Sequence, residues 1–178
     1  MSGECTNVAS PSQTAGPFFH VGLPSVPPAE ARDPIRLVIH VTDGNATAVP
    51  DAVIELWYVA QAAMGPQVPG TATFARACTD SDGRLEFALA PPARTGEAIE
   101  PPSSPHINVC LFARGLLRQV YTRIYFEGES TLEQDGVLAM VPPERRQTLI
   151  ARRDAARPDQ WLFHLRLQGA DETVFFAI

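Results

Sequence analysis

The sequence has 178 residues, 45% of them apolar, which suits one domain with a sizeable core, and its seventeen prolines disfavour long helices. The net charge of −6 argues against a nucleic-acid partner, because neutralising phosphates needs clustered Lys and Arg. No apolar run is long enough to span a membrane, and Met1–Glu4 does not begin a signal peptide. Cys5, Cys78 and Cys110 are too widely spaced for a disulfide framework or a zinc site. We therefore expect a cytoplasmic protein with no nucleic-acid or membrane partner.

Residues 1–34 are rich in Pro, Ser and Gly and show no periodicity, so they are predicted to form an extended N-terminal arm. Within it, Phe18 and Phe19 are adjacent aromatic residues that need a buried environment. The arm is therefore expected to pack on its own domain or on a partner subunit. Residues 35–178 are predicted to form the folded domain.

This domain shows a succession of short apolar and β-branched runs typical of strands. They lie at 35–41, 52–59, 71–77, 84–89, 104–113, 119–126, 161–167 and 173–176. Turn signals separate several of them, including Asp43-Gly44 and Asp82-Gly83. One short helix is predicted from Pro142-Pro143-Glu144 to Ile150. This pattern favours an all-β fold, an antiparallel β-sandwich.

The strand at 104–113 carries the most informative polar residues. His106 and Asn108 are two positions apart, so they share one face of the strand. A His-x-His strand would present two imidazoles to a metal there, but Asn108 occupies the second position. One His and one Asn do not make a transition-metal site, which needs more ligands of suitable type. His20, His40 and His164 are better explained by packing or surface roles.

Tyrosinate is a good ligand for ferric iron, so the three tyrosines bear on this question. They are Tyr58, Tyr121 and Tyr125, and none lies between residues 59 and 120, in the segment leading to His106. Gly-x-Ser-x-Gly and glycine-rich phosphate loops are also absent from the sequence. The sequence therefore predicts neither a metal site nor a catalytic group in this chain.

Strand alternation places Tyr121, Arg123 and Tyr125 on one face. An arginine between aromatic residues can bind a carboxylate through two hydrogen bonds or stack on a ring. Alternation alone favours a simpler interpretation, in which Arg123 forms an ordinary salt bridge at the sheet rim.

Several segments together resemble the intradiol ring-cleaving dioxygenases. They are the arm 11–23 and the segments 55–57, 105–115, 122–126, 144–151 and 165–176, which span nearly the whole chain. The resemblance implies a β-sandwich that works as a heteromer of homologous α and β subunits. The complex would cleave the ring of protocatechuate with O₂, giving 3-carboxy-cis,cis-muconate in aromatic catabolism.

In this family the β subunit holds one non-haem Fe³⁺ through two tyrosines and a His-x-His strand. His106 and Asn108 fall on the two histidine positions, and neither tyrosine position is filled here. The resemblance therefore implies an α-type chain that binds no iron and needs its β partner for activity.

The resemblance also assigns substrate-facing residues. Thr14, Gly16 and Pro17 of the arm would line the cleft formed with the β subunit, and Arg123 would reach the substrate. Two alternatives remain from the sequence. The chain could be a free-standing sandwich module that binds aromatic acids without catalysis, or, with less support, a complete dioxygenase whose ligands lie elsewhere.

Overall fold

The computed structural model describes residues 22–31, 33–61, 70–94 and 103–177. Eight strands make one curved, nearly closed sheet in the order β3-β2-β5-β6-β7-β8-β1-β4. The strands are β1 (Ile35–Thr42), β2 (Val53–Ala60), β3 (Thr71–Cys78), β4 (Arg84–Leu89), β5 (His106–Phe112), β6 (Val120–Phe126), β7 (Ile150–Arg153) and β8 (Gln160–Arg166). The predicted all-β sandwich is confirmed.

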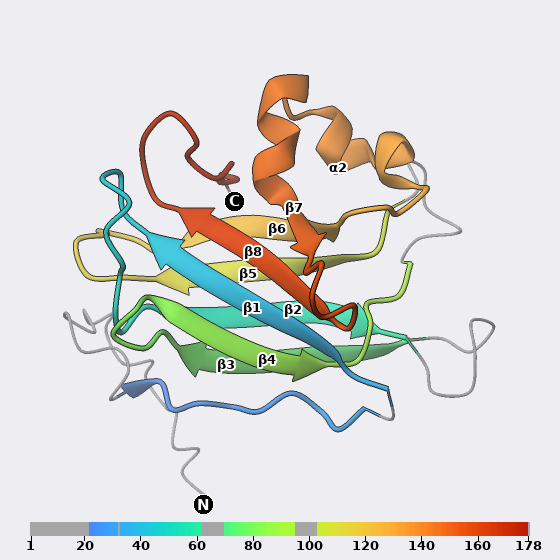
Figure 1. Ribbon diagram of the computed structural model, residues 1–178, viewed down its shortest axis with the longest axis horizontal. Coiled ribbons are helices and arrows are strands. Elements are labelled where there is room, and N and C mark those ends of the chain that lie inside the picture. Colours follow the sequence, from blue (N-terminus) through green and yellow to red (C-terminus); the bar gives the residue numbers. More distant parts are fainter. Residues whose placement is uncertain (1–21, 32, 62–69, 95–102, 178) are drawn as a thin grey trace, which may run out of the picture.

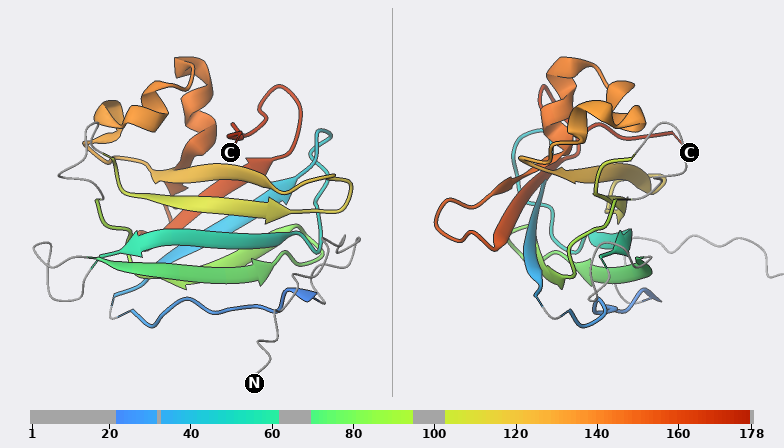
Figure 2. Two further views of the ribbon diagram at one scale, coloured as in Figure 1. Left: turned by 180° about the vertical axis from the view of Figure 1, so that it is seen from behind. Right: turned by 90° about the vertical axis from the view of Figure 1, so that its right-hand side faces the viewer.

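The sheet folds into two layers, as Figures 1 and 2 show from opposite sides. One layer holds β3, β2, β5 and β6, the other holds β8, β1 and β4, and the short β7 joins them. Apolar side chains at alternate positions of both layers fill the space between, among them Leu37, Leu56, Ile107 and Phe163. This is the period-two burial expected of a sandwich.

Two of the pairings are parallel, although the sequence patterns predicted an antiparallel sheet. β1 runs parallel to β8, and β6 runs parallel to β7. The β6–β7 pair cannot close by a tight turn, because parallel strands need a crossover connection. That connection contains three short helical segments: η1 (Leu132–Gln134), α2 (Gly136–Ala139) and η2 (Pro143–Leu149). They form the cap at the top of Figure 1.

The helix predicted from Pro142 coincides with η2, which is a 3₁₀ segment with proline at its start. The segments η1 and α2 and the strand β7 were not predicted. They are only three or four residues long, too short for a period to show. The predicted terminal strand 173–176 is reduced to one bridge, between Phe176 and Tyr121 of β6.

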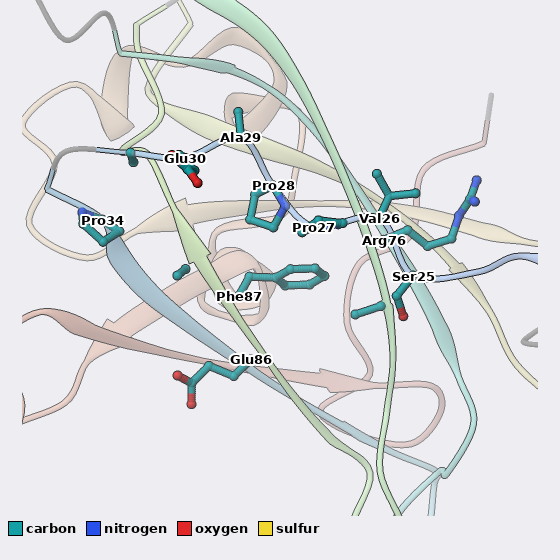
Figure 3. Close-up of a pocket in the computed structure, with 13 residues that line it drawn as sticks. Ser25, Val26, Pro27, Pro28, Ala29, Glu30, Pro34, Arg76, Glu86 and Phe87 are labelled. Carbon is teal, nitrogen blue, oxygen red and sulfur yellow. The ribbon is translucent and has the colours of Figure 1, made fainter.

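The described part of the arm covers the seam between the two ends of the sheet. Val26 pairs with Arg76 of β3 through two backbone hydrogen bonds of 2.8 Å. Residues 25–31 and Pro34 lie toward β4 and border a hollow of about 560 Å³ over Phe87 and Ala88 (Figure 3). Its walls are mainly Pro, Ala and Val side chains, and the Arg76 guanidinium is bound by Glu55. We therefore interpret this hollow as a packing feature of the seam.

Candidate functional site

The outer face of β5 and β6 gathers the polar residues that the sequence singled out. In β5, Ile107, Val109 and Leu111 join the core between the layers, so His106 and Asn108 face outward. The antiparallel register sets Asn108 opposite Arg123 and His106 opposite Tyr125. The structure thus brings Arg123 close to His106 and Asn108. Sequence alternation alone did not show this, because it does not give the register between strands.

A pocket of about 360 Å³ lies over this face. Its floor comes from β2, β5 and β6, and its walls from α2 and the C-terminal segment. The side chains that shape it are Trp57, Asn108, Cys110, Tyr121, Arg123, Val137 and Phe176. Apolar walls around a small number of polar groups are typical of sites for small organic ligands.

Arg123 is the cation of this pocket and is half-buried. Within the described part of the chain, none of the ion pairs includes Arg123. The structure therefore gives no support to a rim salt bridge within those residues. A partly desolvated guanidinium beside apolar walls is well suited to bind a carboxylate of a ligand.

Trp57 adds a flat aromatic surface to the site. Half of its side chain is exposed (51%), and its ring packs on Phe74 with ring centroids 4.3 Å apart. Neither Trp57 nor the pocket residues Val137 and Phe176 were predicted as site residues. Trp57 was detectable only as the outward neighbour of Tyr58 in an alternating strand, whereas α2 and the C-terminal segment reach the site only through the tertiary fold.

His106 is held by its own loop. Its Nδ1 lies 2.8 Å from the Ser104 carbonyl oxygen, so Nδ1–H donates to that oxygen, and the Ser103 hydroxyl is 3.2 Å away. Burial, opposed by this hydrogen bond, lowers the pKa of His106 below its ordinary value. Its ring also contacts Tyr125, with centroids 5.8 Å apart. His106 is therefore a neutral, hydrogen-bonded structural residue at neutral pH.

The donor groups on this face do not fit a ferric site. The Tyr125 hydroxyl donates to Asp135, and burial raises the pKa of Tyr125, so it remains a phenol. Tyr58 points into the core, and burial raises its pKa to about 12. No cluster of three His, Cys, Asp or Glu suited to a metal occurs in the described ranges. The described residues therefore do not give His106 and Asn108 the anionic ligands that ferric iron needs.

The other predicted site residues are Thr14, Gly16 and Pro17, and these lie outside the described residues, as does His20. The nearest described segment shows where the arm meets the domain. The Arg76 guanidinium donates to the Pro24 carbonyl oxygen at 3.4 Å and stacks over Phe74, the ring that contacts Trp57. The arm therefore reaches the domain at the edge of the layer that carries the pocket.

Comparison with known proteins shows to which family this chain belongs. The chain is 37% identical to the protocatechuate 3,4-dioxygenase alpha chain of Burkholderia cepacia, in an alignment covering 95% of this chain and 97% of the relative. For the Pseudomonas putida alpha chain the identity is 34%, with 94% and 95% covered. The chain belongs to the family of protocatechuate 3,4-dioxygenase alpha chains. No family model matches the sequence.

Solved structures support the fold of this family. A dioxygenase domain from Streptomyces superposes with a TM-score of 0.57 at 23% identity, covering 90% of this chain and 98% of that domain. Hydroxyquinol 1,2-dioxygenase from Pseudomonas putida gives 0.58 at 20% identity, with 92% and 68% covered. At these identities the likeness concerns the sandwich itself. In the described residues, no helix has the length and apolarity of a membrane span.

Proposed function

We propose that this chain is the non-iron subunit of a protocatechuate 3,4-dioxygenase and helps to shape the substrate cleft. The observation that carries the proposal is the pocket on the β5–β6 face. It holds Arg123, a cation that pairs with no carboxylate of the described residues, beside His106 and Asn108, which those residues do not complete into an iron site. Family membership supplies the substrate class.

In this proposal a homologous β subunit holds the Fe³⁺, which would activate the catechol and dioxygen for ring cleavage. Protocatechuate and O₂ combine to give 3-carboxy-cis,cis-muconate, with both oxygen atoms incorporated. This chain would contribute binding. Arg123 would pair with the ring carboxylate, and apolar side chains such as Trp57 and Phe176 would exclude water and so strengthen that ion pair.

The arm completes the cleft in this proposal. Thr14 would offer a hydroxyl, and Gly16 would allow the backbone to approach the ligand closely. Pro17 would restrict the conformation of the chain there. The contacts of residues 24–26 with Arg76 support this role, because they hold the described end of the arm at the edge of the layer that carries the pocket. A cytoplasmic location for the complex is part of the proposal.

A second candidate is a free-standing module that binds aromatic acids, since the pocket and Arg123 suit such a ligand without a partner. The test is to measure iron content and protocatechuate cleavage of the chain alone and co-expressed with a homologous β chain. The subunit proposal predicts an iron-free, inactive chain that joins an active, coloured complex. Tight binding of protocatechuate by a chain that assembles with no β partner would favour the module instead.

A further inference from the structure

Asp135 is a buried carboxylate for which the proposed reaction gives no role. It is 1% exposed and receives hydrogen bonds from three separate parts of the fold. The Ser104 backbone N–H donates at 2.8 Å, the Tyr125 hydroxyl at 2.9 Å, and the Val137 and Leu138 N–H groups of α2 at 3.0 and 2.8 Å. Burial opposes ionisation, but these bonds outweigh it and lower the pKa of Asp135.

The bond from Tyr125 connects this carboxylate to the face of β6 that also carries the pocket residue Arg123. Tyr125 is fully buried beneath α2 and η2, packed with Leu138, Val141 and Leu149. Arg123 is two residues away on the same strand face, opposite Asn108. At this separation the long Arg123 side chain can reach the Tyr125 hydroxyl. The guanidinium also opposes the rise that burial causes in the pKa of Tyr125.

Chemistry decides which group donates and which accepts between Asp135, Tyr125 and Arg123. An ionised carboxylate can only accept, so Tyr125 must donate its proton to Asp135. The phenol oxygen then has only lone pairs to offer its other neighbours. A guanidinium has only donors, so Arg123 is the matching partner. The negative charge of Asp135 polarises the phenol and makes its oxygen a stronger acceptor.

We propose that Tyr125, oriented by Asp135, is a positioning residue that holds the Arg123 guanidinium in place for the carboxylate of the substrate. The inference rests on the proposed function, in which Arg123 recognises that carboxylate. Without the Tyr125 oxygen, a long arginine side chain would sample several rotamers and would lose entropy on binding. Asp135 itself is too deeply buried to contact substrate.

The test uses the complex with the β partner and the variants Tyr125→Phe, Arg123→Ala and both together. Each complex is assayed with protocatechuate, and its inhibition constant for 3,4-dihydroxybenzamide is measured, because this amide keeps the shape but lacks the charge. Tyr125→Phe should raise the KM for protocatechuate by roughly threefold to tenfold with little change in kcat or in amide binding. The double variant should behave like Arg123→Ala alone.

The control is Tyr58→Phe, the same change at a buried hydroxyl that lies in the core and has no hydrogen-bond partner among the described residues. Its KM should equal that of the unaltered complex. Asp135→Asn is a second variant. It keeps an oxygen acceptor for α2 but removes the charge. It should lower the preference of the complex for protocatechuate over the amide, and by less than Tyr125→Phe does.

Failures of the two proposals are distinguishable. If Arg123→Ala weakens protocatechuate binding while Tyr125→Phe and Asp135→Asn leave the acid-to-amide preference unchanged, the positioning role is refuted and the subunit role stands. If Arg123→Ala changes nothing, the recognition role of Arg123 and the positioning role fall together. A complex that has neither iron nor activity in its unaltered form contradicts the proposed function itself.

Discussion

Asn108 lies directly opposite Arg123 in the antiparallel β5–β6 pair. This register places a position that resembles a metal ligand next to a guanidinium that no carboxylate of the described chain pairs with. A cation at this point disfavours a second, metallic cation by Coulomb repulsion and favours an anion. The same outer face thus differs chemically from an iron site while keeping the form of a ligand pocket.

Replacing Arg123 should affect substrate binding more than iron loading. In the assembled complex, Arg123→Ala should raise the KM for protocatechuate by roughly 10- to 100-fold, the worth of a charge-assisted hydrogen-bonded pair. Iron content, measured by elemental analysis, should stay the same. Arg114→Ala removes an arginine whose contact with Asp51 is long and exposed (3.9 Å), and it serves as the control. Unchanged kinetics in Arg123→Ala would remove this residue from the site.

Restoring the second histidine should not create an iron site. Asn108→His would place two imidazoles on the β5 face, but Tyr125 remains bound to Asp135 and Tyr58 remains in the core. Without tyrosinate ligands we expect no visible charge-transfer band and no retained iron in the purified chain after incubation with Fe³⁺. An unaltered β partner treated in parallel should be coloured. A tyrosinate-to-iron band in Asn108→His would contradict this account of the site.

Removing the hydroxyl group should have different effects on the free energy of unfolding at the two buried tyrosines, Tyr58 and Tyr125. Tyr58 has no hydrogen-bond partner in the part of the chain that the structure describes, so Tyr58→Phe should leave the free energy of unfolding unchanged or raise it by up to about 1 kcal/mol. Tyr125→Phe removes the 2.9 Å bond to Asp135 and should lower it by about 1 kcal/mol or more. Urea unfolding measures both. Equal destabilisation by the two changes would show that Tyr58 has a partner in solution.

Stability should fall in mildly acidic solution. Burial lowers the pKa of His106 below its ordinary value, so the unfolded chain binds a proton at a higher pH than the folded chain. The stabilisation is therefore complete above about pH 6.5 and declines as the pH falls below it. His164, whose pKa is also lowered by burial, is more exposed and should contribute less.

Urea midpoints measured from pH 7.5 to 5 test this expectation. His106→Gln should flatten the decline in that range. Asp135 titrates in a different window, because its lowered pKa makes its contribution disappear only at lower pH. A profile equally steep with and without His106 would show that other groups control the acid sensitivity.

The ion pair that anchors the arm should matter more than a similar pair on the surface. Arg76 and Glu55 are joined at 2.7 Å with side chains 18% and 12% exposed, so Arg76→Ala leaves a largely buried carboxylate unpaired. We expect a loss of about 2–3 kcal/mol. Arg36 and Glu86 are also 2.7 Å apart, but they are 47% and 37% exposed, and Arg36→Ala should cost under about 1 kcal/mol. Urea unfolding compares the two variants, and equal losses would refute the anchoring role.

The sequence by itself determined the all-β class, most strand positions and the fact that His106 and Asn108 share one strand face. These follow from local rules, since β-branched runs form strands and side chains alternate with a period of two. The match to Arg84–Leu89 is complete, and six other predicted strands agree within about two residues. The strand β7 was not predicted, and the segment 173–176 forms only one bridge. The resemblance to a family was also readable, because it depends on segments along the chain.

Only the tertiary structure decided which distant residues share the site. Register placed Arg123 opposite Asn108, and the long connection from β6 to β7 brought Asp135 to the Tyr125 hydroxyl. The parallel pairing of β1 with β8 joins segments more than a hundred residues apart, which no local pattern encodes. The physical reason is that sheet pairing and burial depend on non-local hydrogen bonds and packing, whereas sequence periodicity records only the local backbone.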